Sequence, residues 1–425
     1  MQVQEVENRS EDRSVNDYLS KPIASIPRIS LQAFCEQTST RELLEQALAD
    51  RRFGRAQARV NSGGISVALE AFRNAPTPNL IVIESSAERD VLLSQLDALA
   101  EICDAETKVV VIGHVNDIIL YRELIARGVS EYMVHPFETT HFVRIISELY
   151  AKPGQRLIGR MIAVSGVKGG VGASTIAHNL AWALSQSLDQ PAIIVDMDFA
   201  FGTAGLDFNQ DPPQGIADAL AAGERLDVAL VERLLTRCDA RLSILCAPAM
   251  LDRKFDIAEQ DFDPLLHILR GCAPYIILDL PHGWPSWKSN VLASADEALI
   301  VASPDLAALR NSKSMFDFLR NARPNDLVPK LVLNGTGLPK RPEIPPSDFA
   351  KALGANPVCI IPHDAKTFGT AANNGQMIGE LNGADKTAQI FFELARKISG
   401  RMDQRGDTAG LIMPLVSKWR NIFAS

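Results

Sequence analysis

Short apolar runs alternate with amphipathic stretches through the first third of the chain. The apolar runs predict strands, and the stretches between them, with apolar residues on one helical face, predict helices. The predicted strands are 29–34, 56–59, 80–84, 108–112 and 131–134, and the predicted helices are 40–50, 64–71, 89–102, 118–126 and 140–150. This alternation favours a doubly wound parallel sheet.

The pattern changes after 151–156, a short polar linker of turn-forming residues. From 157 to about 400 the predicted strands are continuous apolar runs, which are typical of parallel strands buried on both faces. They lie at 161–165, 192–196, 242–246, 275–279, 297–301, 331–334 and 358–361, with helices between them. The sequence therefore predicts an α/β protein with two doubly wound parallel-sheet domains, at 28–150 and 157–400.

The two ends of the chain lack this alternation. Residues 1–27 are polar and charged and predict a disordered tail. After the polar stretch 401–410, four apolar residues share one helical face: Leu415, Trp419, Ile422 and Phe423. Two interpretations of this last segment stay open, a helix lying on a membrane surface and a terminal helix folded back onto the protein.

Composition narrows the function classes. A chain of 425 residues has room for two or three domains with their own cores. Its net charge of −8 gives no broad basic field, so nucleic-acid binding is not expected. The six cysteines are scattered, which suits the reducing cytoplasm and argues against a zinc or iron–sulfur centre. No apolar run reaches about 18 residues, so no transmembrane helix is predicted.

The most informative segment is the strand, glycine-rich loop and helix at 161–175, with the sequence MIAVSGVKGGVGAST. Glycines at 166, 169, 170 and 172 allow backbone N–H groups to point at one spot, and the N-terminus of the helix beginning near Ala173 adds a partial positive charge. This arrangement predicts a phosphate cradle. Ser174 and Thr175 stand where such loops place hydroxyls, Ser174 for Mg²⁺ and Thr175 beside a phosphate.

The position of the lysine identifies the kind of loop. The usual lysine slot holds Ala173, while Lys168 stands at the front of the loop. A front lysine is the signature of the deviant Walker A loop, and the chain resembles the MinD/ParA ATPases that carry it. The string KGGVGAST followed by IAHNLAWAL resembles the CpaE/TadZ branch, MinD-like proteins of Flp/Tad pilus assembly. The resemblance assigns nucleotide binding to Gly169, Gly170, Val171, Gly172, Ala173, Ser174 and Thr175.

Two of the predicted strands end in acidic residues, and a nucleotide site requires carboxylates at such strand ends. Asp196 and Asp198 follow an apolar run, and residues two apart lie on the same side of a strand. Asp196 is predicted to bind Mg²⁺ through water, and the resemblance assigns the attacking water to Asp198. The alternative is an acidic strand end that caps the next helix. Asp279 ends the run at 275–279 and is predicted to accept from the loop hydroxyl or a Mg²⁺-bound water.

A late strand supplies the candidate for base recognition. Asn334 ends the run at 331–334 and suits an amide that reads adenine, with a strand cap as its alternative. The cofactors predicted are ATP and Mg²⁺, the metal being held by Ser174, Asp196 and Asp279. Ala173 cannot supply the charge of the usual lysine, and such a donor contributes on the order of a few kcal/mol to catalysis. In the family, the front lysine, here Lys168, reaches across a dimer interface to the partner's nucleotide. We therefore expect a nucleotide-gated homodimer with slow hydrolysis or none.

The first domain resembles a response-regulator receiver. Segment 127–137 resembles the receiver's last strand with its lysine–proline turn, and 79–84 resembles its phosphoacceptor strand. However, Glu84 replaces the accepting aspartate, Gly113 falls where a Ser or Thr switch would be, and His135 replaces the lysine. We expect a degenerate receiver used for docking, with Pro136 in the cis form.

Further residues near the loop carry weaker signals. His178, on the helix after the loop, is expected to pack rather than to take part in chemistry. Trp284, Trp287 and Lys288 follow Asp279, where relatives carry a mobile, partner-facing switch, although buried aromatic residues are the competing interpretation.

The resemblance implies a protein that localises and helps to assemble the Flp/Tad pilus machinery at a cell pole, with pilus assembly proteins as partners and contact with the inner membrane. One alternative is a ParA-type partitioning ATPase that binds DNA, which the acidic balance disfavours. Another is a true response regulator with an ATPase output, which Glu84 and His135 disfavour.

Overall fold

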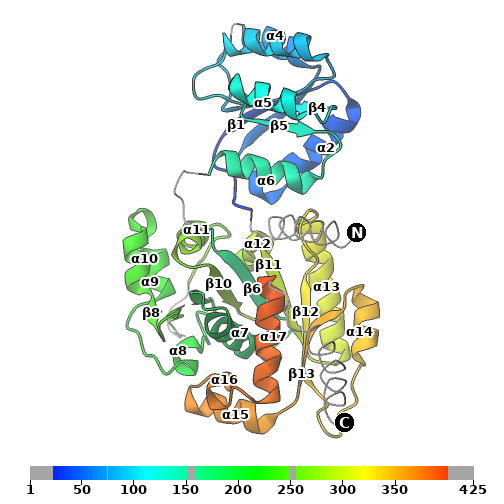
Figure 1. The fold of residues 1–425 in the computed structure, drawn as a ribbon. Coiled ribbons are helices and arrows are strands. Elements are labelled where there is room, and N and C mark those ends of the chain that lie inside the picture. The colour runs from blue at the N-terminus through cyan, green and yellow to red at the C-terminus, as the bar shows by residue number, and fades with distance from the viewer. Residues whose placement is uncertain (1–22, 74, 152–157, 249–254, 401–425) are drawn as a thin grey trace, which may run out of the picture. The chain divides into compact units, whose positions relative to one another are not determined.

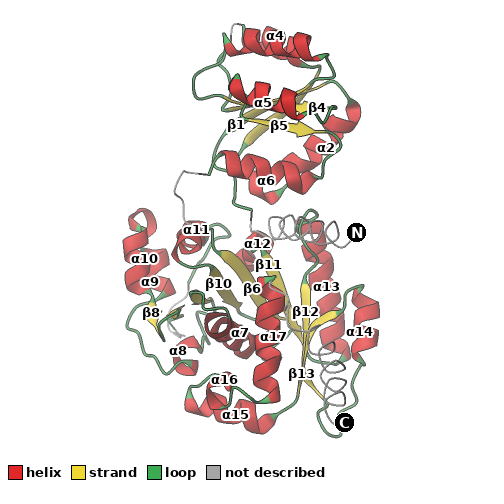
Figure 2. Cartoon of the chain, viewed as in Figure 1, coloured by secondary structure: helices red, strands yellow, loops and turns green. Residues whose placement is uncertain are grey.

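The computed structural model describes residues 23–73, 75–151, 158–248 and 255–400. Contacts between Cα atoms divide these residues into two compact units. The first unit consists of the described residues within Pro22–Arg156 together with Asn321–Leu327, and the second consists of those within Leu157–Arg320 and from Val328 onward. Both units are α/β, with helices packed on a central sheet (Figures 1 and 2).

The first unit is built on a five-stranded parallel sheet with the order β2-β1-β3-β4-β5. Its strands are β1 (Ser30–Cys35), β2 (Gln57–Ser62), β3 (Leu80–Glu84), β4 (Lys108–Gly113) and β5 (Glu131–Val134). Its helices are α2 (Thr38–Leu48), α3 (Ile65–Phe72), α4 (Arg89–Ala100), α5 (Ile118–Ala126) and α6 (Thr139–Leu149). This strand order is that of flavodoxin-like folds, a class of doubly wound parallel sheets.

Two hydrophobic cores lie on opposite faces of this sheet. Leu44 of α2 and Phe142 of α6 belong to one core. Ile65 of α3, Leu96 of α4 and Leu124 of α5 belong to the other. Helices therefore cover both faces of the sheet, which confirms the doubly wound architecture.

The start of the first unit differs from the prediction. Residues 1–22 lie outside the described residues, but 23–27, expected to be tail, contact the core. Ile26 is fully buried, and the hydroxyl of Ser147 donates to the carbonyl of Ala24 at 3.0 Å. The prolines at 22 and 27 suggested a boundary, whereas burial of the isoleucine between them places 23–27 with the folded unit.

The second unit is built on an eight-stranded sheet with the order β13-β12-β11-β6-β10-β7-β9-β8. The strands are β6 (Arg160–Gly166), β7 (Ala192–Asp196), β8 (Thr236–Arg237), β9 (Leu242–Leu245), β10 (Tyr275–Leu280), β11 (Glu297–Ala302), β12 (Lys330–Thr336) and β13 (Pro357–Pro362). All seven predicted strands are present and pair in parallel. The edge strand β8 pairs antiparallel with β9 and was not predicted.

Helices cover this sheet on both sides (Figure 1). They are α7 (Ala173–Ser187), α8 (Ala204–Asp207), α9 (Ile216–Ala221), α10 (Val228–Leu234), α11 (Asp263–Cys272), α12 (Ser286–Ser294), α13 (Leu306–Ala322), α14 (Pro346–Leu353), α15 (Ala365–Asn374), α16 (Ile378–Leu381) and α17 (Lys386–Ser399). In the part of the chain that the structure describes, no helix has the length and apolar character needed to span a bilayer. The predicted apolar face at 411–423 lies outside the described residues.

The strand order brings the predicted site residues to one edge of the sheet. Strand β10 lies between β6 and β7, although it follows them by some eighty residues or more. In this register Asp279 stands beside Asp196 on one side and Val164 on the other. The loop after β6 and the ends of β7 and β10 therefore meet at the carboxyl edge, where ligands bind in open α/β sheets.

Candidate nucleotide-binding site

The loop between β6 and α7 is shaped by its glycines. Gly170 and Gly172 have φ angles of +76° and +83°, in the left-handed region that residues with a side chain rarely adopt. Gly172 is also the N-cap of α7, and a Cβ there would lie 2.6 Å from Nδ2 of Asn334. A Cβ on Gly166 would lie 2.7 Å from the side chain of Val171. The path of this loop therefore requires glycine.

Backbone donors collect at the mouth of the loop. Within the described ranges, the N–H groups of Gly169 and Gly170 and those from Gly172 to Thr175 donate to no protein acceptor. Two loop carbonyls, in contrast, are held: Nδ2 of Asn311 donates to O of Val167 at 3.0 Å, and Nδ2 of Asn334 donates to O of Val171 at 2.8 Å. Free N–H groups at a helix N-terminus favour an anion with several oxygens, such as a phosphate.

Asn334 has a role that the sequence did not suggest. It lies inside β12 rather than at its end, so the alternative of a strand cap does not apply. Its amide holds the loop through Val171, and this donor is therefore already engaged. The predicted contact of Asn334 with adenine stays a prediction.

Lys168 is held within its own chain. Its Nζ lies 2.8 Å from Oδ2 of Asp305, which also accepts from Oγ of Ser303 at 2.5 Å. Burial alone would raise the pKa of Asp305, but the hydrogen bonds from Lys168 and Ser303 lower it to about 2. The sequence did not identify Asp305 as the partner of the front lysine.

Asp196 and Asp198 both hold the segment that follows β7. Asp196 is buried, and its oxygens accept from the backbone N–H of Asp198 and of Ala204, each at 3.1 Å. Burial and the neighbouring charge of Asp279 raise the pKa of Asp196 to about 7. Oδ1 of Asp198 accepts from the N–H of Phe201 at 3.0 Å. Because β7 ends at Asp196, strand alternation does not determine where the Asp198 side chain points.

Asp279 keeps one carboxylate oxygen unpaired. Its side chain is 2% exposed, Oδ2 lies 3.3 Å from Nε2 of His178, and Oδ1 has no hydrogen-bond partner among the described residues. The predicted hydrogen bond with a loop hydroxyl is not formed in this structure, since neither Ser174 nor Thr175 donates to Asp279. A buried carboxylate oxygen requires a partner, and a water on Mg²⁺ would supply one.

The donor set suits magnesium better than a structural metal. Among the described residues, no three or more His, Cys, Asp or Glu side chains converge as ligands. Mg²⁺ is usually held by one or two carboxylates together with phosphate oxygens and water. Asp279 beside a phosphate-binding loop, with the hydroxyl of Ser174 at the start of α7, matches that requirement.

His178 has polar partners that the predicted packing role did not include. The ring is fully buried, Nδ1 lies 2.7 Å from Oδ2 of Asp207, and Nε2 faces Asp279. Burial alone would lower the pKa of His178, but the contacts with Asp207 and Asp279 raise it to about 10. The ring also packs on Phe208 at 5.7 Å between centroids. The ring is therefore packed in the interior, as predicted, and in addition it is paired with carboxylates that the sequence did not indicate.

The segment after β10 is held by a buried lysine. Nζ of Lys288 donates to O of Gly283 at 3.0 Å and to O of Pro281 at 2.5 Å. Burial lowers the pKa of Lys288 to about 8, although Asp279 and Asp198 oppose this shift. Trp287 is buried, which fits the interpretation of a buried aromatic residue. Trp284 is half exposed, which fits the interpretation of a partner-facing segment.

The corresponding strand end of the first unit is closed. Glu84 is fully buried, and it accepts from Oγ1 of Thr40 at 2.6 Å and from N of Gln37 at 2.8 Å, with Nε2 of His114 at 3.1 Å. A side chain at Gly113 would overlap the hydroxyl of Tyr132, so a Ser or Thr has no room there. The His135–Pro136 peptide bond is cis.

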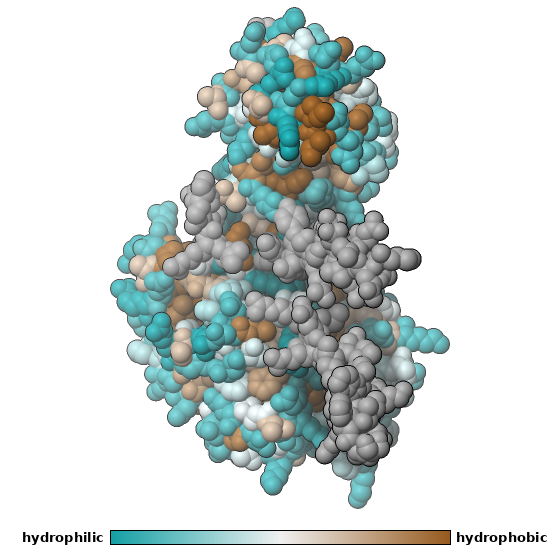
Figure 3. Space-filling view, in the orientation of Figure 1, coloured by the Kyte–Doolittle hydropathy of each residue, from teal (hydrophilic) through white to brown (hydrophobic). Residues whose placement is uncertain are grey.

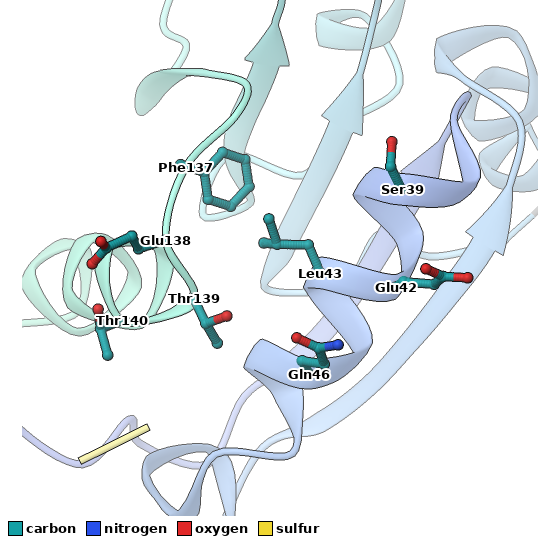
Figure 4. Close-up of a pocket in the computed structure, with 8 residues that line it drawn as sticks. All are labelled: Ser39, Glu42, Leu43, Gln46, Phe137, Glu138, Thr139 and Thr140. Atoms are coloured by element: carbon teal, nitrogen blue, oxygen red, sulfur yellow. The ribbon is translucent and has the colours of Figure 1, made fainter. Parts of the chain in front are cut away.

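A surface hollow of about 460 Å³ lies away from these strand ends (Figure 4). It lies in the first unit, between α2 and the start of α6. It is lined by Ser39, Glu42, Leu43, Gln46, Phe137, Glu138, Thr139 and Thr140. None of these residues belongs to the loop or to the acidic strand ends, so this hollow is separate from the candidate site.

The sheet order, the glycine loop and the acidic strand ends define the second unit as a MinD/ParA-like P-loop NTPase fold. Residues 160–314 match the family described as cellulose biosynthesis protein BcsQ. This range runs from β6 into α13 and includes the loop, Asp196 and Asp279.

Known proteins similar to the chain include a septum site-determining protein and a ParA family ATPase. The septum site-determining protein MinD of Synechocystis sp. is 29% identical over 257 residues, which cover 57% of this chain and 91% of that protein. The ParA family ATPase of Chlorobium tepidum is 25% identical over 56% of this chain and 97% of that chain, with a TM-score of 0.50.

A pilus assembly protein is also similar over a shorter part. The pilus assembly protein CpaE of Caulobacter crescentus is 46% identical over 30% of this chain and 98% of the solved chain, with a TM-score of 0.30. More than two thirds of this chain lies outside that overlap.

Proposed function

We propose that the chain binds Mg²⁺–ATP at the loop of 166–175 and acts as a nucleotide-gated dimer with weak hydrolysis or none. The observation that supports this function best is that, among the described residues, the N–H groups between Gly169 and Thr175 have no protein acceptor and Asp279, on the strand paired with β6, keeps an unpaired oxygen. A triphosphate with its magnesium would satisfy both. The relatives named as ATPases agree with this assignment.

The proposed roles follow from the position of each residue. The N–H groups of 169–175 bind phosphate oxygens, and Ser174 and Asp279 hold Mg²⁺, Asp279 through water. Asp196 lies beside Asp279 and joins the metal site through water, and Asp198 orients the attacking water. Because Ala173 has no charge to offer, hydrolysis within one chain is slow.

Dimer formation supplies the missing charge in this proposal. Lys168 is 38% exposed and bonded to Asp305, which is itself part exposed. An exposed ion pair of this kind contributes only about 0–1 kcal/mol, so Lys168 can leave Asp305 at little cost and reach the nucleotide of a second copy.

Light scattering with and without Mg²⁺–ATP tests this function. Wild type is expected to double its mass with the nucleotide, whereas Lys168→Ala is expected to bind nucleotide and stay monomeric. Lys313→Ala, which removes an exposed lysine of α13 paired with Asp317, is the matched control and should dimerise like wild type. Dimerisation of Lys168→Ala at wild-type nucleotide concentrations would contradict the proposal.

We further propose that the chain localises the Flp/Tad pilus machinery at a cell pole, in contact with the inner membrane. This part rests on the resemblance of the KGGVGAST loop and the helix after it to the CpaE/TadZ branch. The first unit offers a docking face: exposed apolar side chains gather at α5 (Figure 3), namely Val115, Ile118, Ile119, Tyr121 and Ile125. Apolar surface of this kind marks interaction sites. A fluorescent fusion of the wild-type chain is expected to form foci at a cell pole. Ile118→Lys should disperse these foci, and unchanged foci would contradict the proposed localisation.

A further inference from the structure

His178 links two segments that are far apart in the sequence. It belongs to α7, and its two ring nitrogens face carboxylates from different elements. Nδ1 faces Asp207 at the end of α8, at 2.7 Å, and Nε2 faces Asp279 on β10, at 3.3 Å. The first contact is a short hydrogen bond, whereas the second is an ion pair whose geometry leaves Nε2 outside hydrogen-bond alignment.

The ring is fully buried between two carboxylates. Buried polar groups require partners, and the ring and the two carboxylates therefore fix one another in place. Asp279 and Asp196 are both buried and adjacent, and His178 contacts Asp279 through one carboxylate oxygen. The other oxygen of Asp279 has no hydrogen-bond partner among the described residues.

Helix α8 is fastened at both of its ends. Asp196 holds the N–H of Ala204 at 3.1 Å, at the start of α8. Asp207, at the end of α8, holds His178. Leu206, between them, is 73% exposed. A displacement of α8 would therefore change the position of His178, and through it the carboxylate of Asp279.

We propose that His178 is a positioning residue that couples α8 to Asp279, so that the conformation of the segment after β7 determines how Asp279 presents its free oxygen to Mg²⁺. This inference rests on the proposed nucleotide function and concerns a side-chain contact within the same site. Residues that orient a metal ligand from behind typically change metal affinity by about 10–100-fold when they are replaced.

The contact itself can be tested without nucleotide, on the full chain labelled with ¹⁵N-histidine. A buried imidazole N–H bonded to a carboxylate gives a proton resonance far downfield, and His178→Gln identifies it by its loss. In Asp207→Asn the resonance should move upfield, because the carboxylate partner is gone. A resonance that is absent in wild type, or unchanged in Asp207→Asn, would overturn the proposal.

The coupling is tested by ADP binding with Mg²⁺ and with EDTA. Asp207→Asn should weaken Mg²⁺–ADP binding about tenfold while metal-free ADP binding stays at the wild-type level. His178→Gln, which retains an amide donor toward Asp279, should lose less affinity than His178→Leu. The double variant His178→Leu/Asp207→Asn should be no weaker than His178→Leu, because both changes break one linkage.

Asp317→Asn, on the exposed part of α13, is the control and should bind like wild type. Equal losses with and without Mg²⁺ would indicate a merely structural role and overturn the coupling. If wild type binds no ADP under either condition, the proposed function fails and this inference fails with it. If wild type binds and Asp207→Asn binds equally well, only the inference fails.

Discussion

Both units end a central parallel strand with a buried carboxylate that faces a histidine, yet the two strand ends differ. In the first unit, both oxygens of Glu84 have partners, from Thr40, Gln37 and His114. In the second unit, His178 contacts one oxygen of Asp279, and the other oxygen has no hydrogen-bond partner among the residues that the structure describes. The same architecture thus produces two kinds of strand end. The one at Glu84 is closed, because it leaves no polar group for a ligand to pair with, and the one at Asp279 is open, because one carboxylate oxygen is still free.

The contrast shows that the carboxylate alone does not define a site. Both acidic residues stand at the carboxyl edge of a doubly wound sheet, the usual place for a ligand. What distinguishes Asp279 is the supply of free backbone donors next to it, from Gly169 to Thr175. A binding site in such a fold therefore requires polar groups that the protein leaves unsatisfied.

The largest effect is expected from opening the closed strand end. Glu84→Ala removes the acceptor for the part-buried N–H of Gln37 and for the buried hydroxyl of Thr40, and an unsatisfied buried donor costs about 1–3 kcal/mol. We expect the first unit to lose about 3 kcal/mol of unfolding free energy, measured by urea denaturation followed by far-UV circular dichroism. Glu84→Gln, which keeps one acceptor oxygen, should lose less. A fall in nucleotide affinity in Glu84→Ala would contradict the distinction between the two strand ends, because no ligand is assigned to Glu84.

The second effect is expected from closing the open strand end. Gly172→Ala forces a side chain into a left-handed conformation and toward Nδ2 of Asn334. The strain of about 2 kcal/mol should reduce nucleotide affinity roughly 30-fold, measured by calorimetry. Gly128→Ala is the matched control, because Gly128 has φ +91° with no atom within 4 Å of its Cβ position. The control should bind nucleotide like wild type, and equal losses in the two variants would contradict the assignment.

A smaller effect separates the metal from the phosphates. Ser174→Ala removes the hydroxyl proposed to hold Mg²⁺ but keeps the N–H groups of the loop. Mg²⁺–ADP affinity should fall about tenfold, or about 1.4 kcal/mol, while ADP measured in EDTA binds unchanged. An equal fall in both conditions would assign Ser174 to the phosphates instead.

The smallest effect concerns stability at the front of the loop. Lys168→Ala should change the unfolding free energy by less than about 1 kcal/mol at pH 7, because the pair with Asp305 is exposed. Since the pKa of Asp305 is lowered to about 2, its contribution is present above pH 4 and is lost as pH falls through about 2. Chemical denaturation at pH 7 and pH 2 checks this, and a difference that persists at pH 2 would show another role for Lys168.

Much of the fold could be predicted because the strands are continuous apolar runs. Leu80–Glu84, Glu131–Val134 and Ala192–Asp196 match their predicted ranges. The edge strand β8 was missed because two residues, Thr236 and Arg237, carry no periodic signal. The burial of Ile26 was missed because the short stretch between two prolines, residues 23–26, carries no helical or strand periodicity.

The loop and its acidic partners could be predicted because motif residues stand at fixed spacing. The side-chain contacts of these residues could not be predicted from the sequence. Asp207 lies 29 residues beyond His178, and Asp305 lies 137 residues beyond Lys168. Lys168 and Asp305 meet because β11 lies beside β6 in the sheet, and His178 and Asp207 meet because α8 packs against α7. The chain sequence states neither arrangement.

Amide hydrogen exchange measured with and without Mg²⁺–ATP tests the central claim most directly. The account predicts that the N–H groups from Gly169 to Thr175 become strongly protected when the nucleotide is added, because they then donate to phosphate oxygens. The amides around Glu84 serve as the internal reference and should exchange at the same rate in both conditions. Unchanged exchange across 169–175 at saturating Mg²⁺–ATP would contradict the claim that this loop binds a triphosphate without the usual lysine.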